Sequence, residues 1–172
     1  MQETAEQYKQ RLAGYLGEQD ALKVQAAAPA KIERLLKRVS PAKLRKRPTP
    51  GKWSVAEILA HLADAEIVGG YRIRSILAAP GTPIVAYDQD RWAEASNYAR
   101  KDPQRSLELY RTMREGNLRL LKSLKPEQWK HYGIHSERGQ ESIETIARMY
   151  AAHDLNHLRQ IQAIIETSPA RR

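Results

Sequence analysis

Two histidines four residues apart, His153 and His157, are the side chains of this sequence best suited to bind a metal ion. On a helix, residues at this spacing lie one turn apart on the same face, so two imidazoles can reach one cation. The surrounding apolar residues follow the spacing of a buried helical face: Ile143, Ile146, Ala147, Tyr150, Ile161 and Ile164. Both histidines fall on that face and are predicted to point inward.

An inward pair of histidines has two interpretations. Each buried ring nitrogen needs a partner, and a hydrogen-bonding group can supply it as well as a metal ion can. The spacing of His153 and His157 is compatible with a structural pair and with a metal-binding pair. A third ligand elsewhere in the chain would decide between them.

The composition indicates one domain with a full hydrophobic core. The chain has 172 residues, of which 41% are hydrophobic and 28% are charged, and these values are ordinary for a folded domain. No apolar run is long enough to span a membrane, and the first residues lack the features of a signal peptide. The absence of cysteine excludes disulfides and thiolate metal sites, so a cytoplasmic location is expected.

The net charge of +9 favours anionic partners. Part of this charge lies in residues 43–47, Lys-Leu-Arg-Lys-Arg, and such a segment can bind phosphate or nucleic acid. No aromatic residue is interleaved with it to stack on bases. We therefore interpret the segment as a solvated linker and do not expect specific nucleic-acid binding. A small anionic substrate is also compatible with the charge.

The rest of the chain has the pattern of helices almost throughout. Helices are predicted over residues 4–16, 20–39, 54–78, 103–123 and 142–165, with a short helix near 89–95 and a loop over 129–139. Pro29 would break or restart the second helix. Ser54 and Glu57 form a capping box at the start of the third, and Asp102 with Pro103 begins the fourth.

Four long helices with a long connection between the second and third predict an all-α four-helix bundle. Residues 1–172 are interpreted as a single domain, in which 1–19 form an N-terminal helical extension and 20–166 form the bundle. The pair Gly69-Gly70 lies in the middle of a predicted helix, where glycine lowers helix stability. Close helix packing, room for a ligand or a kink would each account for it.

Three segments resemble motifs of the DinB/YfiT-like superfamily. Residues 53–66, Trp-Ser-Val-Ala-Glu-Ile-Leu-Ala-His-Leu-Ala-Asp-Ala-Glu, resemble its second-helix motif. Residues 150–157, Tyr-Ala-Ala-His-Asp-Leu-Asn-His, together with Ile161, resemble the motif of its last helix, and residues 135–139 resemble the loop before that helix. The resemblance runs from about residue 21 to 165, although Glu66 stands where many relatives have a histidine.

The resemblance implies a DinB-like metal-binding four-helix bundle in which His61, His153 and His157 bind one divalent ion, zinc or nickel. Several members of the superfamily are S-transferases that use bacillithiol, mycothiol or glutathione. Others are described only as candidate metal-dependent hydrolases or as stress-induced proteins. Three imidazoles would leave the ion an open position for a water or a thiol, which would lose its proton there and become a nucleophile. Because the chain has no cysteine, a low-molecular-weight thiol would supply the sulfur.

Further polar residues are candidates to orient the histidines or to line a substrate pocket: Glu57, Asp64, Arg114, Asn117, Tyr150 and Asn156. Three classes of function follow from these observations. The first is a metal-dependent enzyme acting on a small molecule, either an S-transferase or a hydrolase. The second is a non-catalytic, stress-related metal-binding protein. The third is a basic bundle that binds nucleic acid or a protein partner and has structural histidines. A homodimer is compatible with each class.

Overall fold

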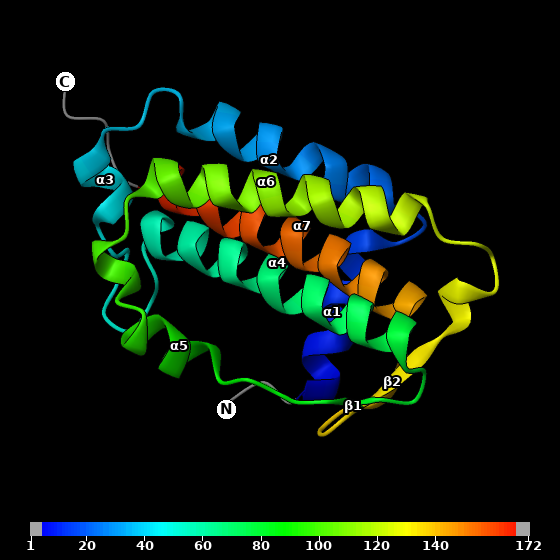
Figure 1. The fold of residues 1–172 in the computed structure, drawn as a ribbon. Coiled ribbons are helices and arrows are strands. Elements are labelled where there is room, and N and C mark those ends of the chain that lie inside the picture. Colours follow the sequence, from blue (N-terminus) through cyan, green and yellow to red (C-terminus); the bar gives the residue numbers. More distant parts are fainter. Residues whose placement is uncertain (1–4, 168–172) are drawn as a thin grey trace.

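The computed structural model describes residues 5–167, which fold around four long helices that run alongside one another (Figure 1). These helices are α2 (Ala21–Leu36), α4 (Val55–Ala78), α6 (Pro103–Lys122) and α7 (Ile143–Thr167). The additional helix α1 (Ala5–Leu16) packs against α7. The structure therefore confirms the predicted four-helix bundle, with its long connection between α4 and α6. No helix within residues 5–167 is long and apolar enough to cross a membrane.

Local sequence signals determine where the central helices begin. At the start of α4, the Ser54 hydroxyl accepts a hydrogen bond from the backbone N–H of Glu57, and the Glu57 carboxylate accepts one from the backbone N–H of Ser54 at 2.8 Å. At the start of α6, the Asp102 carboxylate accepts backbone hydrogen bonds from the first turn, and Pro103 occupies a position that needs no N–H donor. Both predicted helix starts are confirmed.

The prediction that Pro29 interrupts the second helix is wrong, because α2 continues through this residue. Proline has no N–H to donate to the carbonyl four residues earlier, so the carbonyl of Gln25 loses its helical partner. The guanidinium of Arg114 on α6 donates to this carbonyl at 3.1 Å instead. A contact between helices thus satisfies the backbone group that the proline leaves free.

The connections contain short elements, several of which the sequence did not reveal. The short helix α5 is confirmed, whereas the predicted loop over 129–139 is wrong because it contains strands. The bounds are α3 (Pro41–Arg45), β1 (Pro83–Ile84), α5 (Gln89–Ala95), β2 (Tyr132–His135) and β3 (Gly139–Ser142), with 3-10 turns at Tyr98–Arg100 and Gln128–Lys130. Strand β2 pairs in parallel with β1 and antiparallel with β3, which forms a small sheet at one end of the bundle.

The hydrophobic core extends along the bundle in two main clusters. The first cluster contains buried side chains from each of the four long helices, and these include Ile32, Leu59, Tyr110 and Ile161. The second cluster, toward the small sheet, includes Ile73, Ile76, Leu121, Ile143 and Ile146. Between and beside these clusters, α4 buries polar side chains as well, and these determine the chemistry of the interior.

The glycine pair in α4 allows neighbouring helices to approach closely. A Cβ atom added at Gly69 would lie 2.5 Å from the Cζ atom of Tyr150 on α7. A Cβ atom added at Gly70 would lie 2.5 Å from the Oδ1 atom of Asn117 on α6. Close helix packing, rather than a kink, therefore accounts for the two glycines.

We predict that Gly69→Ala lowers the free energy of unfolding by about 1–3 kcal/mol, because the added methyl group overlaps the partly buried ring of Tyr150. The matched control is Gly116→Ala on α6, where nothing lies within 4 Å of the added Cβ. That substitution should stabilise the protein by up to about 1 kcal/mol through helix propensity. Denaturant unfolding measures both values, and an equal effect of the two substitutions would contradict the close packing of Gly69.

Candidate metal centre

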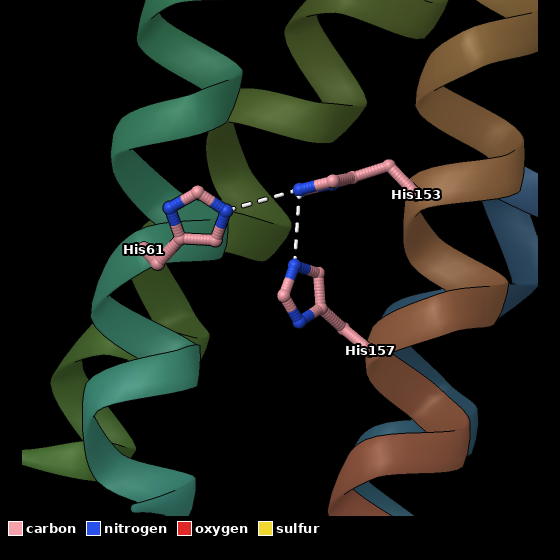
Figure 2. A group of neighbouring side chains, drawn as sticks. All are labelled: His61, His153 and His157. Carbon is pink, nitrogen blue, oxygen red and sulfur yellow. Dashed lines mark hydrogen bonds between the residues drawn. The ribbon is translucent and has the colours of Figure 1, made fainter. Parts of the chain in front are cut away.

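The three predicted histidines meet between two helices of the bundle. His61 projects from α4, and His153 and His157 project from α7, so that the three rings face one another (Figure 2). The Nε2 atom of His153 lies 3.0 Å from the Nε2 atom of His61 and 3.0 Å from that of His157. One nitrogen from each ring lies within 4.8 Å of the other two, a spacing that allows all three to reach one ion.

Neutral imidazoles alone cannot satisfy this cluster. The Nδ1 atom of His157 lies 2.8 Å from the side-chain oxygen of Gln160, an acceptor, so this nitrogen carries the ring proton and Nε2 presents a lone pair. The Nε2 atom of His153 faces two ring nitrogens but can make only one hydrogen bond, since it has either a proton or a lone pair. A cation that receives three lone pairs removes this conflict. A tetrahedral zinc ion would place its nitrogen ligands about 3.3 Å apart, close to the 3.0 Å that separates His153 from each of the other two rings.

The buried environment keeps the rings in the form that binds metal. Burial lowers the pKa of His61 to about 3 and that of His157 to about 4. Burial also lowers the pKa of His153 well below its usual value, and the neighbouring rings of His157 and His61 add to the effect. The three imidazoles are therefore neutral near pH 7, with lone pairs available for a cation.

The outer ring nitrogens differ in their partners. Gln160, which the sequence analysis did not identify, orients His157 through Nδ1. The signal was present in the sequence, because a residue three positions later on a helix lies beside the first. The Nδ1 atom of His61 is buried without a hydrogen-bond partner among the residues that the structure describes, and the ring instead packs on Trp53 with 4.9 Å between centroids.

Glu57 and Asp64 do not orient the histidines, contrary to prediction. The Glu57 carboxylate is bound by the Arg47 guanidinium and by Ser54. Asp64 accepts a hydrogen bond from the hydroxyl of Tyr98 at 2.6 Å. Both carboxylates therefore bind other side chains, and no hydrogen bond joins either of them to an imidazole among the described residues.

Arg114 and Asn117 were predicted to line the pocket, but the structure places them in a buried polar network. Arg114, 2% exposed, donates to the carboxylates of Asp154 and Glu66, the latter at 2.7 Å. Asn117 donates to the backbone carbonyl of Glu66 at 3.0 Å. Asp154 also accepts from the hydroxyl of Tyr110 at 2.8 Å, so both of its oxygens are engaged and it is not free to act as a general base beside the histidines.

Two cavities reach the histidines from different sides. The larger, about 590 Å³, is bordered by His157 and Asn156. Asn156 was a candidate to orient an imidazole, but its side-chain oxygen accepts a hydrogen bond from Arg11 at 2.8 Å. The smaller, about 170 Å³, is bordered by His61 and His153, and the predicted Tyr150 lies in its wall. Each of the three histidines therefore borders one of two cavities large enough for a small molecule.

The fold and the site together define a class of protein: a helical bundle whose core presents three histidine nitrogens to two cavities. A family model described as the DinB superfamily matches residues 26–161, and the chain belongs to this superfamily.

Individual relatives carry names that refer to a metal. "Putative metal-dependent hydrolase YfiT" of Bacillus subtilis is 25% identical over 141 residues, which cover 81% of this chain and 79% of that protein. "Putative metal-dependent hydrolase OB0782" of Oceanobacillus iheyensis is 29% identical over 114 residues, which cover 66% of each chain. The solved structure of YfiT matches with a TM-score of 0.77 at 24% identity, covers 94% of this chain and 87% of YfiT, and has the same four-helix bundle fold.

We predict that Gln160→Ala weakens metal binding about 10-fold or more, because His157 loses the acceptor that fixes its Nδ1 proton. The matched control is Gln162→Ala, which removes an exposed glutamine that donates to Glu166 on the same helix. Competition against a chromophoric chelator measures both affinities. Equal affinities for the two variants would show that Gln160 does not orient the ligand.

Proposed function

We propose that the protein is a metal-dependent enzyme in which His61, His153 and His157 hold one divalent cation, zinc or nickel. The observation that carries the proposal is the convergence of three neutral imidazole nitrogens beside two cavities. Among the side chains that the structure describes, no aspartate or glutamate joins this group of candidate ligands. Three protein ligands and access for a small molecule are typical of catalytic rather than structural zinc sites.

When bound, the cation would supply an open position that favours the deprotonated form of a water or a thiol. The residues of the chain have supporting roles in this proposal. Gln160 holds the Nδ1 proton of His157, and Trp53 covers the ring of His61. Arg11, Lys52 and Asp90 lie in the wall of the larger cavity, and the one net positive charge of these side chains would attract an anionic substrate.

The reaction class we favour is S-transfer from a low-molecular-weight thiol, with hydrolysis as the alternative. Two cavities at one set of histidines suit a reaction between two small molecules. The larger cavity, about 590 Å³, has the volume of a typical ligand pocket and would take the thiol. The names of YfiT and OB0782 support hydrolysis, for which water would take the place of the thiol.

The basic segment 43–47 gives little support to a nucleic-acid-binding function. Lys43 donates to the carbonyl of Ile165 at 2.8 Å, and Arg47 pairs with Glu57. Arg45 donates to the carbonyl of Lys101 at 2.9 Å. These contacts engage three of the basic side chains within the protein itself, which supports the prediction that the segment does not bind nucleic acid specifically.

We expect His61→Ala, His153→Ala and His157→Ala each to lower metal affinity more than about 100-fold, because the loss of a ligand should exceed the effect of losing an outer partner. Metal content per protein, measured by mass spectrometry on untagged protein, tests this. His131→Ala is the control, since His131 lies outside the cluster. Full occupancy in His61→Ala would disprove the assignment of the three ligands.

Turnover tests the proposed reaction. The zinc- or nickel-loaded protein should convert a model electrophile in the presence of bacillithiol, mycothiol, glutathione or coenzyme A. The rate of His157→Ala should be at least about 100-fold lower, because this variant lacks a metal ligand. Simple esters and amides assay the hydrolytic alternative. A protein that binds metal but converts no thiol, ester or amide substrate would instead be the non-catalytic, stress-related metal-binding protein.

A further inference from the structure

Arg72 on α4 is a buried cation without a carboxylate partner among residues 5–167. Its side chain is 7% exposed, its Nη2 donates to the backbone carbonyl of Val85 at 2.8 Å, and its guanidinium lies 5.9 Å from the centre of the Tyr87 ring. A carbonyl and an aromatic ring do not neutralise a full positive charge. Burying such a charge is costly unless a counter-ion accompanies it.

Other arginines in comparable positions have carboxylate partners. Arg114, also buried, contacts both Asp154 and Glu66. Arg138, which shares a cavity wall with Arg72, donates two hydrogen bonds to Glu141, one of them at 2.8 Å. The carboxylate of Glu141 offsets the charge of Arg138, whereas no ion pair with a described carboxylate offsets the charge of Arg72.

Arg72 lines the same cavity as His61 and His153. The cavity measures about 170 Å³, and an apolar cavity of about 150 Å³ can hold a benzene molecule. Among the residues that the structure describes, the Nε and Nη1 atoms of Arg72 form no hydrogen bond. Both atoms remain accessible to solvent. These donors are therefore available to a molecule in the cavity.

We propose that Arg72 anchors a single carboxylate group of a small-molecule substrate whose opposite end lies at the three histidines. A guanidinium presents its N–H groups in a fork that matches the two oxygens of a carboxylate. The single uncompensated charge matches one carboxylate better than a phosphate dianion. The role of the opposite end rests on the proposed metal-dependent function, whereas the anchor itself depends on Arg72 alone.

The placement of Arg72 also limits the shape of the substrate. Arg72 follows His61 by eleven residues on α4, a rise of about 16 Å along the helix axis. Long helical side chains generally lean toward the N-terminus, which would bring the guanidinium nearer to the histidines than the backbone rise alone, and Arg72 lines one cavity with His61 and His153. The anchored substrate is therefore an elongated acid, with its carboxylate several bonds from the reacting group.

Calorimetric titration of the full chain with hexanoate and with hexanamide tests the anchor, because the two probes have the same length and differ in charge. We expect hexanoate to bind wild type at least about tenfold more tightly than hexanamide, and Arg72→Gln to remove this preference. The control is Arg148→Gln, which replaces an exposed arginine that likewise donates to one carbonyl, that of Gly17. It should retain the preference.

Further measurements separate the anchor from the metal. After chelation of the metal, hexanoate should still bind in a manner that depends on Arg72, even if the three histidines prove not to form an enzyme. Hexanoate should also raise the melting temperature of wild type more than hexanamide does, which tests the anchor if Arg72→Gln does not fold.

Binding that is equal in Arg72→Gln and wild type, or that disappears on chelation, would overturn the proposal. Tighter Arg72-dependent binding of inorganic phosphate than of hexanoate would overturn the choice of a carboxylate.

Discussion

The packing of the bundle depends on the ion pairs of one buried arginine. Arg114 on α6 contacts Asp154 on α7, Glu66 on α4 and the carbonyl of Gln25 on α2, and so connects all four long helices. Burial alone would lower the pKa of Arg114, but the interactions with Asp154, Tyr110 and Glu66 together outweigh this effect and raise the pKa well above its usual value. Removing one member of such a buried group costs about 3–5 kcal/mol. Because Asp154 adjoins His153 and Glu66 lies on the helix of His61, the pairing that aligns the helices also brings the histidines together.

The sequence predicted the helices well because their signals are local. The capping box at Ser54 and the Asp102-Pro103 pair both act within one turn of the chain, so they can be recognised without knowledge of the fold. The strands are different, since β1 has two residues and is defined only by pairing with β2, nearly fifty positions later. Pro29 was misjudged for the same reason, because the donor that replaces its missing N–H comes from another helix.

The candidate site shows the same division between local and distant information. The inward pair on α7 follows from helical spacing, and His61 was found through the resemblance of its segment to a known motif. Glu57 and Asp64 were selected because they lie near His61 along the helix. Their carboxylates instead bind residues from outside the helix. Glu57 binds Arg47, and Asp64 binds Tyr98. Helical spacing and the resemblance therefore identified the candidate ligands better than proximity along the helix identified their hydrogen-bond partners.

Arg72 and Arg114 show why function in this bundle cannot be assigned from sequence alone. Neither arginine has an acidic residue three or four positions away on its own helix, so their local sequences give the same expectation. The fold separates them, because α4 and α7 bring two carboxylates to Arg114, whereas Arg72 faces a cavity beside the histidines. The first arginine is neutralised within the protein and contributes to its structure. The second has no carboxylate partner among the described residues and presents its charge to a cavity that a small anion could enter.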